Sequence, residues 1–413
     1  MRILSGNAAA MTVERLAVRS SRLDSIEPQV RSIIKAVRRG GDRGLRRYAE
    51  RWDGLAGEQP LAVSPVEIKQ ASRSISRQLR DALSQSARNI LQFCEWQKPV
   101  SWTRSRDGVS LGQLVIPLES VGCYVPGGRH PLVSTLLMTV IPAQVAGVKN
   151  IRVTSPNPSP EVLAACSMLG IREVYRVGGA QAIAAFAYGT ETIERVDKIV
   201  GPGNVYVTVA KKLVSFDCAI DLVAGPTEAV VMNDSGNPRF IAADLVSQAE
   251  HDPDALSVLI TTRLALAKAV ATEITNMAKE NAAARASLNQ RGAVLLARSR
   301  KQAREWANLL APEHITVSEE DLPFIKNAGS IFVGDYSPQA AGDYASGPNH
   351  VLPTSGQARF RGGLSVMDFV KLVTVQKLSQ GGLQRIARTV ECLAEVEGLN
   401  AHAESIRARY ADA

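Results

Sequence analysis

The residues best suited to chemistry lie in the stretch Gln248-Ala-Glu-His251-Asp-Pro-Asp254. Apolar residues at helical spacing occupy residues 240–250, and Asp252-Pro253 ends that pattern. Because Gln248 and His251 are three residues apart, a helix would direct both side chains from one face. An amide oxygen and an imidazole nitrogen on one face could bind one cation. The alternative interpretation is a helix end with polar residues on its solvated side.

The distribution of histidine favours a site. Of five histidines, only His130 precedes residue 250. The other four each stand in a short polar cluster: Gln-Ala-Glu-His251, Ala-Pro-Glu-His314, Gly-Pro-Asn-His350 and Leu-Asn-Ala-His402. Such a scarce residue, set four times beside acid or amide groups, is more typical of a site than of random surface.

These clusters supply two kinds of chemistry. A mixed nitrogen and oxygen set would suit Zn²⁺ and would tolerate Mn²⁺; its members are Gln248, His251, Asp343 and His402. The adjacent Glu313 and His314 would provide an acid–base pair. His350 is interpreted as a ligand, a base or a hydrogen-bonding loop residue. Spacing alone leaves these roles open, because such distant residues meet only through the fold.

Three glycine-rich turns could form a nucleotide site. They are Tyr124-Val-Pro-Gly-Gly128, Val177-Gly-Gly-Ala-Gln181 and Gly201-Pro-Gly-Asn204-Val-Tyr206. Turn geometry accounts for any one of them, and the usual G-x-G-x-x-G fingerprint is missing. Three such turns, each between a strand and a helix of one sheet, nevertheless leave open the interpretation that they bind one shared ligand, since helix N-termini there attract phosphate.

The elements that must position these residues alternate between strand and helix. Residues 151–222 alternate short apolar runs with helical patterns, and a second such series runs from residue 229 to about residue 310. This pattern predicts two α/β units with open, mostly parallel sheets and a cleft between them. Residues 1–110 are predicted to be mostly helical, with one helix ending at Gly40-Gly41 and another running from Ser64 to about Phe93. A loop follows Gly342, and the last fifty residues are predicted to return to helix.

The chain is expected to divide into four parts. They are an N-terminal extension at 1–20, a discontinuous first α/β domain at 21–122 and 229–365, a second, Rossmann-like domain at 123–228, and a helical C-terminal tail at 366–413.

Composition excludes several classes of protein. The chain has 413 residues, of which 45% are apolar, which is enough for two or more domains. No apolar run reaches the length of a membrane span, and the N-terminus lacks a secretory pattern. The five scattered cysteines indicate reduced thiols in a cytoplasmic protein. The net charge of +8 is interpreted as a solvated basic face, since no nucleic-acid-binding motif accompanies it.

Eight motifs, spread in order over almost the whole chain, resemble histidinol dehydrogenase. They are Tyr-Val-Pro-Gly-Gly at 124–128, Gly-Gly-Ala-Gln-Ala-Ile at 178–183, Gly-Pro-Gly-Asn-Val-Tyr-Val at 201–207, Ala-Gly-Pro-Thr-Glu at 224–228, Ser-Gln-Ala-Glu-His-Asp at 247–252, Ala-Pro-Glu-His at 311–314, Gly-Asp-Tyr-Ala-Ser-Gly-Pro-Asn-His-Val-Leu-Pro-Thr at 342–354 and Glu-Gly-Leu-Asn-Ala-His at 397–402. Three local departures are Thr227, where the family commonly has Ser, Phe93-Cys-Glu-Trp-Gln97, which lacks a His often seen after that Phe, and Gly-Gly-Arg-His-Pro at 127–131.

The resemblance implies a zinc-dependent homodimer that oxidises L-histidinol through histidinal to L-histidine and reduces two NAD⁺. It also implies two incomplete Rossmann-like domains, and a C-terminal tail that completes the partner's site. The implied zinc ligands are Gln248, His251, Asp343 and His402. The implied NAD⁺ contacts are Tyr124, Gln181 and Asn204. The implied substrate contacts are Thr227, Gln248, His251, His314, Asp343, His350, Glu397 and His402. His314 is implied as the acid–base residue, and Glu313 as the residue that activates water.

Two other functions remain open at this point. A paralogue of the same fold would oxidise another small alcohol, such as a sulfonated diol. A protein without activity would bind a metal or nucleic acid through the basic N-terminal region. Glu397 and His402 in the tail favour histidinol, and the adjacent Glu313 and His314 argue against a silent protein.

Overall fold

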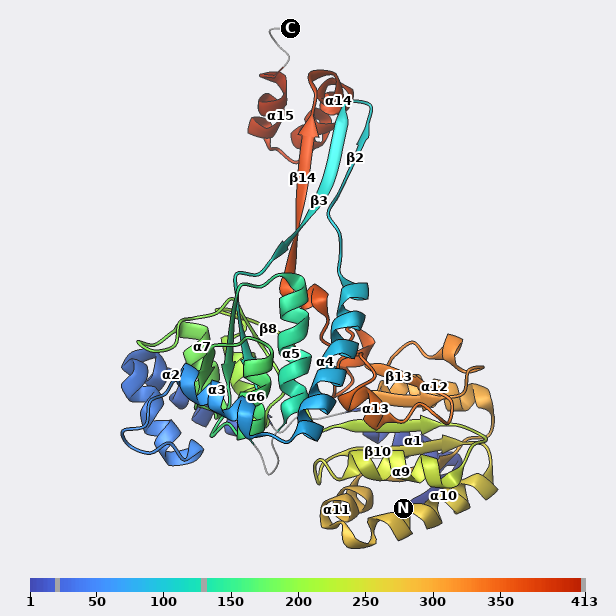
Figure 1. Ribbon diagram of the computed structural model, residues 1–413. Helices are drawn as coiled ribbons and strands as arrows, with labels where there is room; N and C mark the ends of the chain where they lie inside the picture. The colour runs from blue at the N-terminus through green and yellow to red at the C-terminus, as the bar shows by residue number, and fades with distance from the viewer. Residues whose placement is uncertain (19–22, 128–131, 410–413) are drawn as a thin grey trace.

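A computed structural model describes residues 1–18, 23–127 and 132–409. Two open, parallel β-sheets lie side by side, and a long arm projects from the body that they form (Figure 1). The predicted α/β class with open, parallel sheets is therefore confirmed.

The first sheet has six parallel strands in the order β1-β11-β10-β9-β12-β13. The strands are β1 (Arg2–Ser5), β9 (Glu228–Met232), β10 (Leu256–Thr261), β11 (Ala293–Leu296), β12 (His314–Val317) and β13 (Ser330–Val333). One face packs against α1 (Gly6–Ala17) and α12 (Arg300–Leu310). The other packs against α9 (Pro238–Ala249), α10 (Leu264–Met277) and α11 (Ala282–Gln290). Because helices cover both faces, the central strands are continuous apolar runs.

The second sheet has five parallel strands in the order β6-β5-β4-β7-β8. The strands are β4 (Ser120–Tyr124), β5 (Asn150–Thr154), β6 (Glu173–Tyr175), β7 (Lys198–Val200) and β8 (Ala219–Ile220). One core contains α2 (Leu23–Tyr48), α7 (Gly179–Tyr188) and α8 (Val205–Val214). The opposite core contains α3 (Pro65–Ser74), α4 (Arg77–Gln97), α5 (Val133–Ala146) and α6 (Pro160–Met168). The strand order reverses between β4 and β7, so a topological switch point lies there.

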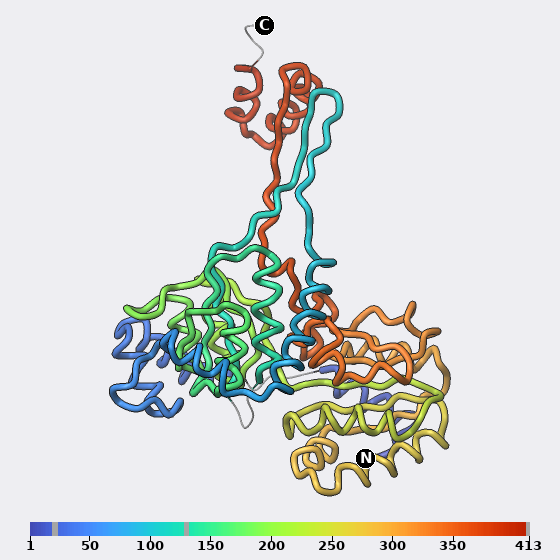
Figure 2. The backbone as a smooth tube through the Cα atoms, in the orientation of Figure 1, coloured from blue at the N-terminus to red at the C-terminus, as the bar shows by residue number. Residues whose placement is uncertain are grey.

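The arm is a three-stranded antiparallel sheet with two helices at its tip (Figure 2). It contains β2 (Trp102–Arg106), β3 (Val109–Pro117) and β14 (Val370–Leu378), followed by α14 (Gln380–Val396) and α15 (Asn400–Arg407). Among the residues that the structure describes, no helix is both long enough and apolar enough to cross a membrane.

The packing differs from the predicted boundaries at both ends of the chain. The N-terminal extension is not separate, because β1 pairs with β11 in the first sheet. The helices between residues 23 and 97 belong to the second sheet, since α2 contacts α7 and α3 contacts α6. The tail also contains a nine-residue strand, β14, where helix was predicted. These pairings join segments distant in the chain, so local periodicity could not reveal them.

Two predicted helix boundaries in the first hundred residues can be compared with the structure. Gly41 has φ 52°, a left-handed conformation that interrupts α2 at the predicted stop, although helix resumes after it. The helix predicted from Ser64 to Phe93 is two helices, and Ser76 provides a new N-cap for the second.

Candidate active site

The centre of the candidate site is Asp343, which lies on the short helix α13 (Gln339–Tyr344). Its Oδ2 accepts a hydrogen bond of 2.8 Å from Gln248 Nε2, and its Oδ1 lies 3.2 Å from His314 Nε2. Gln248 is in the last turn of α9, and His314 begins β12. The structure therefore brings together three predicted residues from separate elements at the amino edge of the first sheet.

A second set of contacts holds Glu313 beside this centre. The Thr227 hydroxyl lies 2.6 Å from Glu313 Oε2 and 3.2 Å from Gln248 Oε1. The backbone N–H of Glu228 donates to the same Glu313 oxygen at 3.0 Å. His314 Nδ1 is 3.8 Å from that oxygen. Thr227 thus links the carboxylate of the acid–base pair to the amide of the predicted ligand set.

Burial and neighbouring charges together shift the pKa values of these groups. Burial raises the pKa of Glu313 to about 7, against the opposing effects of His314 and of the Thr227 hydrogen bond. Burial also acts on Asp343, but the hydrogen bond and charge of His314 outweigh it and lower the pKa of that carboxyl. The pKa of His314 is raised, because Glu313 and Asp343 overcome its burial. A carboxyl group with a pKa near neutrality is suited to general-base work.

His350 connects the centre to the second sheet. Its Nδ1 is 2.7 Å from the backbone carbonyl oxygen of Asp343, so this nitrogen must carry the proton and donate it. Its Nε2 is 3.2 Å from Thr135 Oγ1 on α5. Burial lowers the pKa of His350, which favours the neutral ring.

His251 lies one turn beyond Gln248 and is exposed. It is near enough for its charge to act on the pKa of both Glu313 and His350. Across residues 1–18, 23–127 and 132–409, no three His, Cys, Asp or Glu side chains are grouped to hold a metal. The proposed ligand set contains an amide, and its fourth member lies elsewhere.

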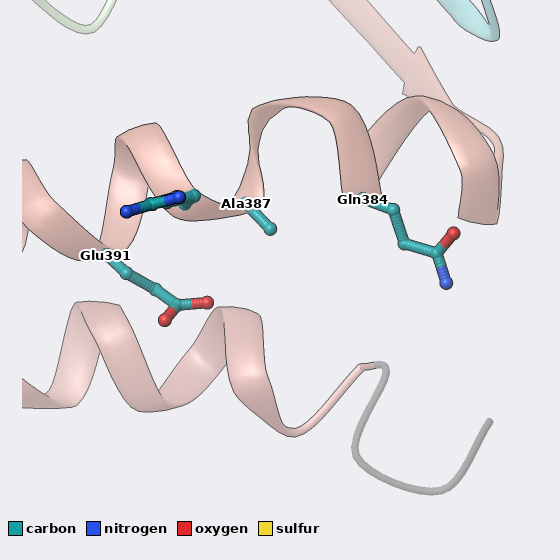
Figure 3. Close-up of a pocket in the computed structure, with 4 residues that line it drawn as sticks. Gln384, Ala387 and Glu391 are labelled. Atoms are coloured by element: carbon teal, nitrogen blue, oxygen red, sulfur yellow. The ribbon is translucent and has the colours of Figure 1, made fainter.

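That fourth member, His402, is on the arm together with Glu397. Glu397 follows α14, His402 is on α15, and both are exposed. Figure 1 shows α14 and α15 at the far end of the arm, away from α9 and α13. A single chain therefore does not bring these two predicted residues to the cluster. A hollow of about 230 Å³ in the arm is lined by residues of α14 and contains neither of them (Figure 3).

The predicted cofactor residues lie at the carboxyl edge of the second sheet. Tyr124 ends β4, and its hydroxyl accepts a hydrogen bond of 3.1 Å from Gly179 N. Gln181 is buried on α7, and the exposed Asn204 caps α8 by accepting from Tyr206 N at 3.0 Å. Tyr124 and Asn204 thus flank the switch point between β4 and β7. Gly128 and His130, in the neighbouring predicted turn, lie outside the described residues.

The sequence analysis missed one carboxylate in this region. Asp53 Oδ2 accepts hydrogen bonds from Gly178 N at 2.9 Å and from Gln181 Nε2 at 3.0 Å. Asp53 therefore fixes the orientation of the Gln181 amide. No local signal marks it, because it lies 125 residues from its partner Gly178.

An acid–imidazole cluster where two parallel sheets meet, with glycine turns at the switch point of one sheet, defines a two-domain α/β enzyme of the dehydrogenase class. The histidinol dehydrogenase family profile matches residues 16–410. The chain belongs to the histidinol dehydrogenase family.

Individual relatives align with this chain over nearly their whole lengths. Histidinol dehydrogenase from Methanothermobacter thermautotrophicus is 47% identical over 409 residues, covering 94% of this chain and 95% of that one. The enzyme from Syntrophotalea carbinolica is 45% identical over 403 residues, covering 94% of each chain. The crystal structure of histidinol dehydrogenase from Elizabethkingia anophelis superposes with a TM-score of 0.95 at 36% identity, covering 100% of this chain and 98% of that one.

Proposed function

We propose that this chain oxidises L-histidinol through L-histidinal to L-histidine, with the reduction of two NAD⁺. The observation that carries the proposal is the contact of Asp343 with the buried side chains of His314 and Gln248, beside Glu313. Membership of the histidinol dehydrogenase family supports this substrate. A role in histidine biosynthesis also favours the cytoplasm as its location.

The donor groups of the cluster fit a divalent metal. Gln248 offers an amide oxygen, His251 an imidazole, and Asp343 a carboxylate whose lowered pKa keeps it ionised. This mixed set suits Zn²⁺, with His402 from a partner's arm as the fourth ligand. When bound there, Zn²⁺ would act as a Lewis acid on the amino alcohol.

His314 is placed to act in the first oxidation. Asp343 holds its Nε2, whereas its buried Nδ1 has no hydrogen-bond partner among the described residues. Nδ1 is therefore the atom that accepts the proton of the substrate hydroxyl. Phe332 stacks on the ring at 5.8 Å between centroids and fixes its plane.

Glu313 serves in the second oxidation, when water adds to the aldehyde. The Thr227 hydroxyl and the Glu228 N–H donate to Oε2, and no residue that the structure describes hydrogen-bonds to Oε1, which leaves Oε1 for the water molecule. A pKa of about 7 lets this carboxylate accept the proton near neutral pH.

The cofactor is proposed to bind at the switch point of the second sheet, which we interpret as an incomplete Rossmann-like unit. Tyr124, Gln181 and Asn204 would contact NAD⁺, which when bound would take up the hydride. Gly201 supports this placement, because a Cβ atom there would collide with the carbonyl oxygen of Tyr124. The turn can therefore lie flat against the end of β4.

The arm supports a homodimer. Its exposed large apolar side chains include Trp102, Leu111, Leu114, Leu372, Val375, Leu393, Val396 and Leu399. Such a surface on a projecting arm is typical of an interface. A second copy would cover it, and the arm would carry Glu397 and His402 to the partner's cluster.

The decisive experiment measures NADH formed per L-histidinol consumed, with and without a chelator. Two NADH per substrate and loss of activity with the chelator are expected. Activity only on other alcohols would instead assign a paralogous dehydrogenase, for which Thr227 would be the first specificity residue to examine. No oxidation together with tight nucleic-acid binding would overturn both enzyme assignments.

A further inference from the structure

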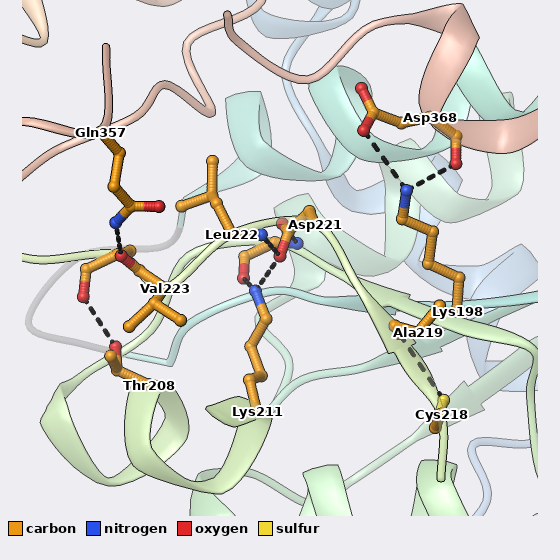
Figure 4. Close-up of polar contacts among 12 residues, drawn as sticks. Lys198, Thr208, Lys211, Cys218, Ala219, Asp221, Leu222, Val223, Gln357 and Asp368 are labelled. Carbon is orange, nitrogen blue, oxygen red and sulfur yellow. Dashed lines mark hydrogen bonds and ion pairs between the residues drawn. The ribbon is translucent and has the colours of Figure 1, made fainter. Parts of the chain in front are cut away.

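A buried ion pair lies behind the proposed cofactor turn. Lys211 on α8 and Asp221 after β8 are 1% and 3% exposed, and Lys211 Nζ contacts Asp221 Oδ1 (Figure 4). Removing two charges from water is costly unless their remaining hydrogen-bonding groups are engaged. The partners of this pair therefore indicate what it holds.

The pair holds both backbone polar groups of Gly201. Asp221 Oδ2 accepts a hydrogen bond of 2.7 Å from Gly201 N, and Lys211 Nζ donates to Gly201 O at 2.9 Å. Gly201 has φ 111° and lies against the backbone of Tyr124. It also begins the turn that ends at Asn204. One ion pair thus fixes the backbone between two of the three proposed cofactor contacts.

Asp221 also begins the segment 221–228, which crosses from β8 to β9. Polar contacts hold this crossover on both sides: Arg361 to Asp221 O, Gln357 Nε2 to Val223 O at 2.6 Å, Thr208 Oγ1 to Ala224 O at 3.0 Å, and Gly225 N to Thr354 Oγ1 at 2.6 Å. Figure 4 shows the first part of this path beside the ion pair. The crossover then continues directly to Thr227 in the catalytic cluster.

We propose that Lys211 and Asp221 are positioning residues that hold the cofactor turn 201–204 in register with the crossover that carries Thr227. This inference rests on the proposed function. Among the described residues, no hydrogen bond or ion pair joins either side chain to a predicted site residue, so the pair acts through the backbone of Gly201. Apolar side chains could fill the same volume, but they could not bind both the N–H and the C=O of that glycine.

The test compares two double variants in the full-length enzyme. K211M/D221N removes the charges behind the turn. The matched control, R300M/D321N, removes an ion pair of 2.5 Å beside the first sheet whose hydrogen bonds and ion pairs involve neither Gly201 nor the crossover. We expect K211M/D221N to raise the KM for NAD⁺ about tenfold with the KM for L-histidinol changed less than about twofold, because small displacements of positioning groups have effects of this size. The control should leave both constants near wild type.

Two further measurements keep the result interpretable. Calorimetric titration with NAD⁺ reports cofactor affinity even if wild type fails to oxidise L-histidinol, so the two proposals fail separately. The single variant D221N retains a side-chain oxygen for Gly201 N and should show a smaller increase in the NAD⁺ dissociation constant; it also serves if the double variant does not fold. Equal NAD⁺ affinity in wild type and in every folded Lys211 or Asp221 variant would overturn the proposal.

Discussion

At the scale of the residue, the site depends on hydroxyl, amide and carboxyl groups that share partners. Thr227 lies within hydrogen-bond distance of both Gln248 Oε1 and Glu313 Oε2. Its hydroxyl connects the predicted metal-ligand set to the acid–base pair, two groups of residues that sequence spacing alone could not relate to each other. Serine, the residue more common in the family, would keep that hydroxyl and remove one methyl group.

We expect Thr227→Val to lower kcat/KM for L-histidinol by about 10- to 100-fold. A hydrogen bond to a charged group contributes roughly 1.5–3 kcal/mol. Its loss would leave the Glu313 carboxylate with only the Glu228 N–H on Oε2. Thr227→Ser should stay within about threefold of wild type. Steady-state kinetics of the two variants provides the measurement, and equal activity of the valine and serine variants would contradict this role.

Residue types predicted several members of the candidate site before the fold was known. Gln248, His314 and Asp343 were predicted from chemistry and resemblance, and they meet as contacts in the structure. Asp53 and the Lys211–Asp221 pair were not predicted. A carboxylate or an ammonium group is common in any sequence, and only tertiary packing shows that it holds a backbone amide.

At the scale of the element, the six-residue helix α13 must place Asp343 correctly although it is too short to be stable alone. Asp244 on α9 accepts a hydrogen bond from the N–H of Gln339, the first residue of α13. Burial nevertheless raises the pKa of Asp244 to about 6 from its ordinary 3.8. The folded protein therefore holds this proton more tightly than the unfolded chain does.

The sign of the resulting pH effect follows from that difference. The stability contributed by protonated Asp244 is fully present below pH 3.8 and is lost as the pH rises through about 6. We expect Asp244→Asn to remove this part of the pH dependence. The free energy of unfolding, measured by denaturant titration at pH 4.5 and pH 8, should fall less in the variant, by on the order of 1 kcal/mol. An identical decline in both proteins would show that Asp244 does not titrate in this range.

Elements with local signals were predictable, and elements made by distant pairing were not. The alternation over residues 151–222 predicted the second sheet because each strand is followed by its own covering helix. β14 pairs with β3 through the register Val370 to Pro117, and its residues are mostly exposed. An exposed strand has no buried face to impose an alternation of polar and apolar residues, so hydrophobic periodicity did not reveal β14.

At the scale of the whole molecule, the arm decides whether the site is complete within one chain. We expect His402→Ala and His314→Ala each to lose at least about 100-fold in activity as pure proteins. Unfolding and refolding them together should restore activity, because a mixed dimer would combine the intact body of the first with the intact arm of the second. If each arm served its own body, both subunits of the mixed dimer would remain defective, and no activity would return. Refolding each variant alone is the control.

The pairing of Arg2 with Ala293 has a consequence for synthesis on the ribosome. The second sheet is built from consecutive strands between residues 120 and 220, so it can form while the rest of the chain is still being translated. Strand β1 stays without this partner until β11 has been synthesised. The second sheet can therefore assemble before the first, and residues 2–5 pair with β11 only late in synthesis.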